Sequence, residues 1–223
     1  MSALLEAIAI DGPAGAGKST VAKMVAAELG FQYLDTGAMY RSAALLALRG
    51  GVALDDESAC GEVARAMEVR FVPGSPQRVL LNGEDVTEEI RTAEVSDAAS
   101  VISVHPPVRR EMVRRQRALC EAGRVVLEGR DTTTVVCPEA RLKVFLTASL
   151  EERARRRLND LLAAGEAATL EDVLEQIRER DVRDTTREHS PLRVAEDALV
   201  VDTDEISAEE AAGRIVAAWR AMP

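Results

Sequence analysis

The segment Gly12–Ser19 reads Gly-Pro-Ala-Gly-Ala-Gly-Lys-Ser and directly follows an apolar run, Leu4–Ile10. A helical pattern with apolar residues on one face, Lys18–Leu29, comes next. A strand, a glycine-rich loop with Lys-Ser and a helix in this order match the spacing G-x-x-x-x-G-K-[ST] of a phosphate-binding loop. The alternative is a chance glycine-rich turn before a helix, but the flanking strand and helix favour the loop.

Each part of this segment has a defined role in holding phosphate. Gly12, Gly15 and Gly17 allow the backbone to curl so that its N–H groups point at phosphate oxygens. The helix that follows presents the positive end of its dipole to the same anion. Lys18 adds a point charge for the outer phosphates, and Ser19 offers a hydroxyl to Mg²⁺. The predicted nucleoside triphosphate site consists of Gly12, Pro13, Ala14, Gly15, Ala16, Gly17, Lys18, Ser19 and Thr20.

The charge balance limits the partners that we expect. Lysine and arginine number 28 against 38 aspartates and glutamates, which gives a formal net charge of −10. Polymeric nucleic acid is not expected as a partner, because it requires a basic surface, whereas a compact pocket for a small phosphate is still allowed. Most basic residues are arginines. This bias reflects either genomic base composition or the two-point hydrogen bonding of phosphate by arginine.

The composition also indicates where in the cell the protein is expected. With 47% hydrophobic residues the chain can bury a large core, but no apolar stretch approaches the roughly 20 residues of a membrane span. Met1–Glu6 has no basic region ahead of the first apolar run, so we expect no signal peptide. Cys60, Cys120 and Cys137 have neither disulfide nor zinc spacing and fit thiols in a reducing cytosol. We therefore expect a cytoplasmic protein without a membrane partner.

Apolar runs alternate with helical patterns along the chain. The predicted strands are Leu4–Ile10, Phe31–Leu34, Arg124–Glu128, Leu142–Leu146 and Ala198–Val201. The predicted helices are Lys18–Leu29, Met39–Arg49, Glu57–Met67, Val108–Ala122, Leu150–Ala163, Thr169–Glu188 and Ser207–Ala221. Ser149 with Glu152 and Ser207 with Glu210 have the spacing of capping boxes. The alternation predicts an α/β fold, a five-stranded parallel sheet flanked by helices.

Residues 68–92 break this alternation. Pro73–Pro76 and Asn82–Gly83 are hairpin signals between short stretches of alternating polarity. These stretches are Glu68–Val72, Val79–Leu81 and Glu84–Val86. We predict a small antiparallel lobe inserted in the α/β core, with a decorated surface loop as the alternative. Gly165–Ala168 separates two helices, as the tip of a mobile arm would.

Two segments follow predicted strands on the rim where open parallel sheets bind ligands. Asp35–Arg41 ends the second strand and begins a helix, so it is expected beside the phosphate-binding loop. The alternative is a plain strand-to-helix turn capped by Asp35. Gly129–Asp131 follows the third core strand, and its Arg130 suits a phosphate while its Asp131 suits a base amino group or hydrated Mg²⁺. A surface ion pair is the alternative there.

Two predicted helices carry clustered charges. Arg180, Asp184 and Arg187 share one face, because they are spaced by four and three residues. That face would bind a sugar hydroxyl and phosphates, or would hold solvated ion pairs. The preceding helix begins with cations that oppose its dipole, as expected where a polyanion docks, although snorkelling or base composition also explains them. These cations are Arg153, Arg155, Arg156 and Arg157.

Together these motifs resemble the bacterial cytidylate kinases, a branch of the nucleoside monophosphate kinases. The resemblance spans nearly the whole chain, and its specificity lies in the Thr36–Arg41 motif, the inserted lobe and the Arg180–Leu192 motif. The matching stretches are Ile8–Thr20, Leu34–Arg41, Asn82–Thr87 with Ile90–Arg91, Val108–Arg109 with Arg114–Arg117, Gly129–Asp131, Arg180–Asp181 and Asp184–Leu192.

The resemblance implies transfer of the γ-phosphoryl group of ATP to CMP or dCMP, with Mg²⁺. It implies one kinase domain over residues 1–223, with an acceptor-side lobe at 68–92 and a helical lid region at 153–187, and we expect a monomer. Lys18, Arg153 and Arg157 are implied to be catalytic. The resemblance also implies a CMP site that includes Thr36 and Tyr40. Arg41 and Arg130 would contact the phosphate of CMP, and Ser100, Arg109 and Asp131 would contact cytosine. Arg180 and Asp184 would contact the pentose, and Arg187 would lie near base and phosphate.

One segment departs from the family pattern. Gly129–Asp131 is usually followed by an apolar residue and a glycine, whereas this chain has Thr132 and Thr133. The side chain of Thr133 restricts the backbone at a position where a glycine would leave it free. We therefore expect altered geometry in the acceptor loop, with a consequence for CMP affinity but not for the reaction class.

Two rival functions are compatible with a phosphate-binding loop. A GTPase switch needs an Asn-Lys-x-Asp guanine reader, but Asn82 and Asn159 precede Gly and Asp, so that reader is absent. A kinase for another small acceptor, such as UMP or a shikimate-like alcohol, is the nearer alternative. A panel of acceptors distinguishes it from a CMP kinase.

Overall fold

The computed structural model describes residues 4–74, 77–163 and 165–222. The chain forms two compact units, one made of Met1–Tyr33 with Ala122–Pro223 and the other of Leu34–Glu121. Ser75 and Pro76 of the predicted Pro73–Pro76 turn lie outside the described residues, as do the first three residues of the Met1–Glu6 segment.

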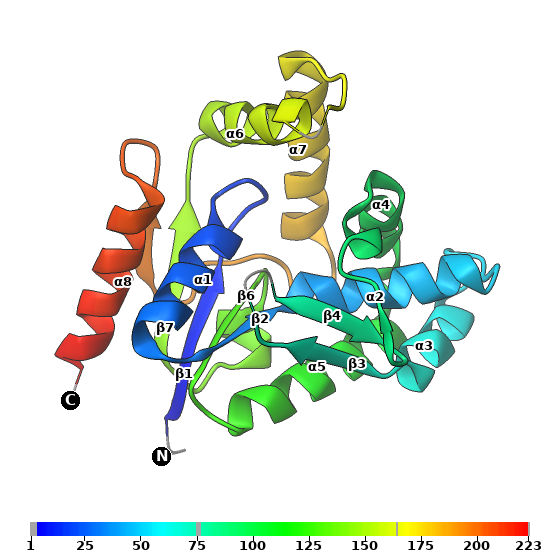
Figure 1. Ribbon diagram of the computed structural model, residues 1–223, viewed down its shortest axis with the longest axis horizontal. Coiled ribbons are helices and arrows are strands. Elements are labelled where there is room, and N and C mark those ends of the chain that lie inside the picture. Colours follow the sequence, from blue (N-terminus) through cyan, green and yellow to red (C-terminus); the bar gives the residue numbers. More distant parts are fainter. Residues whose placement is uncertain (1–3, 75–76, 164, 223) are drawn as a thin grey trace. The chain divides into compact units, whose positions relative to one another are not determined.

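The first unit is organised around a five-stranded parallel sheet, of which Figure 1 labels β1, β2, β6 and β7. Its strands are β1 (Leu5–Asp11), β2 (Gln32–Asp35), β6 (Val125–Gly129), β7 (Ala140–Thr147) and β8 (Leu199–Asp202). The strand order is β2-β6-β1-β7-β8, and β2 runs on into the second unit at Leu34. All five predicted strands are present, so the predicted α/β fold is confirmed. β1 is central, paired with β6 and β7, and it leads directly into the glycine-rich loop.

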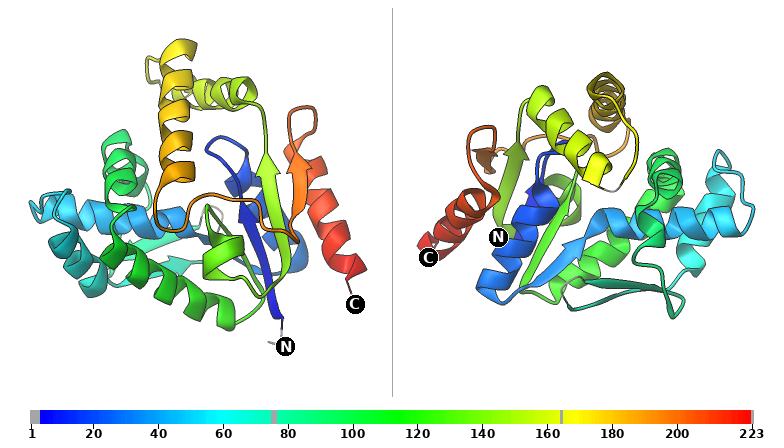
Figure 2. Two further views of the ribbon diagram at one scale, coloured as in Figure 1. Left: turned by 180° about the vertical axis from the view of Figure 1, so that it is seen from behind. Right: turned by 45° about the horizontal axis from the view of Figure 1, so that its top comes forward.

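The helices of the first unit begin and end close to their predicted bounds. They are α1 (Lys18–Leu29), α6 (Leu150–Ala163), α7 (Leu170–Thr186) and α8 (Ala208–Ala221). Figure 2 shows α6 and α7 crossing one another beyond the carboxyl end of β7. In the described part of the chain, no helix is both long and apolar enough to span a membrane.

The capping box predicted at the start of α6 forms only in part. The Ser149 hydroxyl accepts from the Glu152 backbone N–H at 3.3 Å, but the Ser149 N–H donates to Asp204 at 2.7 Å instead of to Glu152. The Glu152 carboxylate instead accepts from Arg155 and Arg156. Glu152 therefore compensates two of the cations whose position opposes the helix dipole.

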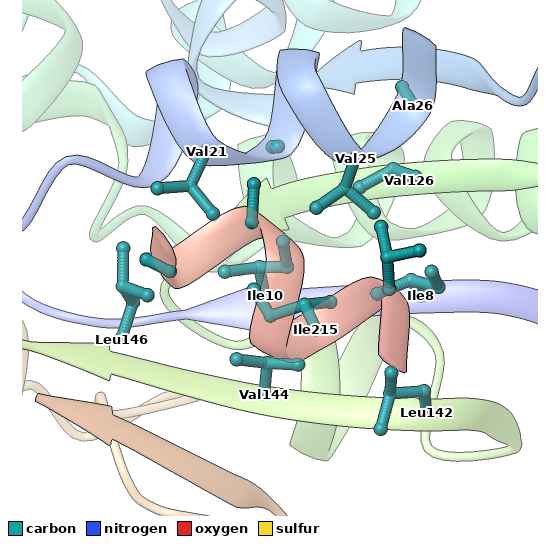
Figure 3. Packing of buried hydrophobic residues seen from close by; sticks show 14 of the residues in the cluster. Ile8, Ile10, Val21, Val25, Ala26, Val126, Leu142, Val144, Leu146 and Ile215 are labelled. Atoms are coloured by element: carbon teal, nitrogen blue, oxygen red, sulfur yellow. The ribbon is translucent and has the colours of Figure 1, made fainter. Parts of the chain in front are cut away.

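The core of the first unit lies between the sheet and the helices α1 and α8. Figure 3 shows Ile8 and Ile10 of β1 pointing toward Val21 and Val25 of α1, with Ile215 of α8 beside them. All five side chains are at most 1% exposed. Each contributes roughly 1.5–3 kcal/mol of hydrophobic free energy when it is buried. This packing fixes β1 and α1, and thereby both ends of the loop between them.

The second unit combines helices with the small antiparallel sheet predicted in residues 68–92. Its helices are α2 (Thr36–Arg49), α3 (Glu57–Ala66), α4 (Ala93–Ile102) and α5 (Pro106–Glu121), and its strands are β3 (Val69–Val72), β4 (Arg78–Leu81) and β5 (Glu84–Asp85). The strand order is β3-β4-β5, with antiparallel pairing throughout. The sheet confirms the predicted lobe, and Asn82 and Gly83, both at positive φ, form the turn between β4 and β5. Across both units, Cys60, Cys120 and Cys137 are buried thiols rather than disulfide-bonded cysteines.

The helix α4 was not predicted. Its buried residues Val95, Ala98, Ala99 and Ile102 have helical spacing, and the Thr92 hydroxyl caps its first turn by accepting from Val95 N–H at 3.4 Å. Small alanines at two of the four buried positions weaken the apolar signal, which explains why the pattern was not recognised. The sequence does contain one signal for the start of α4, which is the capping residue Thr92.

Gly12 is the residue at which the loop leaves β1, and its backbone passes very close to β7. A Cβ atom on Gly12 would lie 2.0 Å from the carbonyl oxygen of Leu146, and the φ of Gly12 is +155°. The obstacle is backbone in the middle of the sheet, so it cannot move aside as a flexible side chain would. Only glycine fits at this position.

We therefore expect Gly12→Ala to lower the free energy of unfolding by about 3 kcal/mol or more, because strain and overpacking add. Gly213→Ala is the matched control, because Gly213 lies in α8 with nothing within 4 Å of its added Cβ. That control should stabilise by about 0.5–1 kcal/mol. Urea unfolding of both variants measures the difference, and equal stabilities would contradict the packing described for Gly12.

Candidate functional site

The glycine-rich loop surrounds the amine of Lys18. Lys18 is only 5% exposed, and its Nζ donates to the carbonyl oxygen of Pro13 at 2.7 Å. Gly15 and Gly17 have φ values of 78° and 84°, in the left-handed region. Gly17 caps α1 without any side-chain hydrogen bond. Gly17 has no side chain that could accept from the first N–H groups of α1, which suits a helix N-terminus that receives an anion.

The pKa of Lys18 also indicates a site that receives an anion. Burial, together with the positive charges of Arg130 and Arg180, lowers the pKa of Lys18 from 10.5 to about 7, although the nearby Glu128 and Asp184 carboxylates oppose the shift. The protein groups around Lys18 therefore stabilise its ammonium form less well than water does. An added anion at this position would restore the charge.

Glu128 is a site residue that was not predicted from the sequence. It is the second-last residue of β6, the strand beside β1, and its Oε1 accepts from the Ser19 hydroxyl and from the Tyr33 hydroxyl, the latter at 2.9 Å. Its side chain is nearly buried. The available signal was an acidic residue directly after the apolar run Val125–Leu127, at the carboxyl end of a buried strand. Together the Ser19 hydroxyl and the Glu128 carboxylate offer the hard oxygen ligands that Mg²⁺ prefers.

Arg153, one of the predicted lid arginines, lies directly on the loop. Its Nη1 donates to the Ala14 carbonyl oxygen at 3.1 Å and forms an ion pair with Asp181 of α7 at 2.8 Å. Its Nε donates to the Ala148 carbonyl oxygen at 3.0 Å. Arg157, by contrast, is exposed on α6. Arg153 is thus a buried link between the loop, α6 and α7.

A second cluster of charges joins α7 to the segment after β6. Arg130 Nε donates to Asp184 Oδ2 at 2.8 Å, and Arg187 lies 3.8 Å from Asp131 and 3.9 Å from Asp184. Burial alone would raise the pKa of Asp184, but the charges of Arg130 and Arg180 outweigh it, so this pKa lies below its ordinary value. Asp184 is 9% exposed. These four residues are therefore largely desolvated, whereas Arg180, the remaining residue of the predicted face, is exposed.

In the second unit, Asp35 has two roles at the start of α2. Its Oδ1 accepts from the Ala38 N–H at 2.9 Å, which caps the helix, and its Oδ2 accepts from Arg41 Nη2 at 2.7 Å. Burial alone would raise the pKa of Asp35, but the Arg41 charge and the Ala38 hydrogen bond bring it below its ordinary value. A Cβ on Gly37 would lie 3.0 Å from Arg41 Nη1, so a glycine leaves room for this guanidinium. Asp35 thus caps the helix, as the alternative interpretation of this strand-to-helix turn predicted, and it also orients Arg41.

The remaining predicted residues of the second unit lie on three helices. Thr36 is the first residue of α2 and is 5% exposed. The guanidinium of Arg109, on α5, lies 5.8 Å from the centre of the Tyr40 ring and donates to the Ser103 carbonyl oxygen at 3.0 Å. Ser100 lies on α4, where its carbonyl oxygen accepts from the Ser103 hydroxyl at 2.9 Å. Tyr40 and Arg109 are thus brought together, and Ser103 links α4 to Arg109.

Comparison with known proteins identifies the family. The cytidylate kinase family model matches residues 8–221. A cytidylate kinase from Listeria welshimeri is 49% identical over 209 residues, covering 94% of this chain and 93% of that protein. The chain belongs to the cytidylate kinase family. A cytidylate kinase from Carboxydothermus hydrogenoformans is 50% identical over 210 residues, covering 94% of this chain and 95% of that protein.

Among solved structures, the chain is similar in fold to an uncharacterised protein from Eubacterium ventriosum. The TM-score is 0.54 with 12% sequence identity, over 96% of this chain and 98% of that chain. At this identity the likeness concerns the fold alone.

The lowered pKa of Lys18 predicts a pH dependence of stability. Between about pH 7 and pH 10.5 the unfolded chain keeps a proton on Lys18 that the folded chain has lost, so Lys18 makes stability rise with pH across this window. Lys18→Met removes this contribution. We expect the variant to be more stable than the wild type by about 1–3 kcal/mol at pH 7, with the difference shrinking toward pH 10.5.

Urea unfolding at intervals from pH 6 to pH 10 measures this difference. Lys23→Met is the control, because Lys23 is exposed on the same helix. Stability curves for Lys18→Met and the wild type that run parallel across the range would contradict the shifted pKa.

Proposed function

We propose that this protein transfers the γ-phosphoryl group of ATP to CMP or dCMP and releases CDP or dCDP. The observation that supports the proposal best is the buried Lys18 amine in a phosphate-binding loop, with Arg130 and Arg180 close enough to lower its pKa. Positive charges gathered in this way disfavour the protonated form of Lys18, and a bound anion would favour it again. Membership of the cytidylate kinase family supports a nucleotide as that anion.

For the donor, we propose that residues Gly12–Thr20 bind the phosphates of ATP. The backbone N–H groups of the loop and of the α1 N-terminus would donate to phosphate oxygens, and Lys18 would lie at the outer phosphates. Ser19 and Glu128 would hold Mg²⁺, which supplies positive charge to the phosphates when it is bound. Arg153 would keep the Ala14 carbonyl fixed and, with Arg157, would offset charge on the transferred group.

For the acceptor, we propose that CMP binds to the residues implied by the family pattern. Arg130 is held by Asp184, and Arg41 by Asp35, so two of the proposed phosphate ligands are already oriented by carboxylates. A guanidinium fixed in this way loses less entropy when it binds a phosphate. The full proposed set is Thr36, Tyr40, Arg41, Ser100, Arg109, Arg130, Asp131, Arg180, Asp184 and Arg187.

The chemistry then rests on charge and positioning. The phosphoryl group in transfer spreads negative charge over its equatorial oxygens, which Lys18 and the arginines would offset. A strong base is not needed, because the attacking oxygen of CMP is already an anion. Residues 153–187, which include α6 and α7, would act as a lid that excludes water, the competing nucleophile. We further propose that 68–92 is the acceptor-side lobe of a single kinase domain, in a cytoplasmic monomer.

An acceptor panel tests this function. With ATP and Mg²⁺, we expect ADP release to be fastest with CMP and dCMP, well behind them with UMP, and absent with shikimate. The measurement is a coupled assay of ADP at equal acceptor concentrations, together with the identification of CDP as product. Equal or faster turnover with UMP or shikimate would contradict the proposal.

Two controls make the panel specific to this site. Lys18→Ala should lower turnover by about 10²–10⁴-fold without loss of folding, because the variant lacks the charge at the outer phosphates. Removal of Mg²⁺ with excess EDTA should abolish ADP release, and added Mg²⁺ should restore it. ADP release that survives the Lys18→Ala substitution unchanged would come from another site or a contaminant.

A further inference from the structure

The carboxylate of Asp11 is fully buried at the end of β1 and accepts four hydrogen bonds. Its Oδ1 accepts from the N–H and the hydroxyl of Thr132 at 2.8 and 2.7 Å. Its Oδ2 accepts from the N–H and the hydroxyl of Thr133 at 2.8 and 2.6 Å. Each oxygen thus binds one of two consecutive residues in the segment after β6. We call these three residues the aspartate–threonine clamp.

The clamp joins two segments of the first unit. On one side, Asp11 pairs with Gly129 in the sheet, and the next residue, Gly12, is confined by Leu146. On the other side, Thr132 begins a short π-helix, Thr132–Val136, in which the Asp131 and Thr132 carbonyl oxygens accept backbone hydrogen bonds of 2.8–3.0 Å. The start of the phosphate-binding loop and the end of the Gly129–Asp131 segment are therefore fixed by one carboxylate.

Thr133 is accommodated without backbone strain. In the described residues, the only positions other than glycine with positive φ are Asn82, Arg124 and Ser190. The expectation that a side chain at position 133 disturbs the local geometry is thus not supported by its backbone angles. The side chain instead supplies a donor: without its hydroxyl, Oδ2 of Asp11 would keep only the Thr133 N–H.

Loss of that donor would matter because an ionised carboxylate without water needs its hydrogen bonds. Burial raises the pKa of Asp11, and the hydrogen bonds from Thr133 and Thr132 counteract the rise. A weakened clamp leaves the buried charge poorly compensated, so the Thr132–Thr133 backbone would shift to improve the remaining contacts. Such a shift begins one residue after Asp131 and two after Arg130.

We propose that the hydroxyl of Thr133, acting through Asp11, is a positioning group that sets the places of Arg130 and Asp131. Arg130 donates to Asp184, and Asp131 faces Arg187, so a shift of this backbone would be transmitted to both contacts. The consequence for CMP rests on the function proposed above, whereas the positioning itself does not.

The test compares Thr133→Val, which keeps the shape and removes the hydroxyl, with Thr133→Ser, which keeps the hydroxyl. Crystal structures of the wild type and of both variants report the Arg130–Asp184 contact directly. We expect it to lengthen beyond hydrogen-bond distance in Thr133→Val and to stay near 2.8 Å in Thr133→Ser. An unchanged Arg130 and Asp131 in Thr133→Val would overturn the proposal.

Kinetics provide the second readout. In Thr133→Val we expect the KM for CMP to rise about five- to tenfold while the KM for ATP changes less than about twofold, with Thr133→Ser close to wild type. Trp219→Phe is the control for lost stability, because Trp219 packs against Phe31 beyond the C-terminal end of α1, and it should leave both KM values unchanged. Equal rises in both KM values, or a CMP effect in Trp219→Phe, would overturn the proposal. A wild type that does not phosphorylate CMP would refute the proposed function, and the crystal structures would still decide the positioning.

Discussion

The burial of one amine, that of Lys18, is the constraint on which the rest of the first unit depends. The glycine-rich loop curls around it, the Pro13 carbonyl holds it at 2.7 Å, and α1 begins at the same residue. Burial and neighbouring arginines lower the pKa of Lys18 to about 7. A folded chain gains nothing in stability from such a group, so its presence is explained by a ligand whose negative charge reverses the effect.

Carboxylates organise the cationic groups around this amine. Asp11 fixes the backbone on which Arg130 and Asp131 lie, Asp184 orients Arg130, and Glu128 accepts from the Ser19 hydroxyl. Each of these carboxylates is at most 9% exposed. The pairing of Arg130 with Asp184 orients this arginine before any ligand binds, which lowers the entropy lost on binding.

The sequence predicted the strands and most helices well because their signals are local. β1 and α1 have the apolar periodicity of buried elements, and the loop between them has fixed glycine spacing. α4 was missed because two of its buried residues are alanines. Glu128 was missed because nothing in the local sequence distinguishes a carboxylate that binds a ligand at the end of a strand from one that forms an ion pair. The clamp was missed for a different reason: Asp11 and Thr133 meet only after folding, and a threonine hydroxyl has no periodicity. Strand-end position and helical spacing singled out Arg130, Asp131 and the face of Arg180, Asp184 and Arg187, but only the family resemblance assigned them to CMP.

Proton uptake on nucleotide binding tests the central claim about Lys18 most directly. Calorimetric titration of the protein with Mg²⁺–ATP at pH 8, in buffers with different ionisation enthalpies, gives the number of protons bound per ATP. We expect uptake of nearly one proton by the wild type, because ATP recharges an amine whose pKa is about 7 in the free protein, and none by Lys18→Met. The same proton uptake by both proteins, or none by either, would contradict the role given to Lys18.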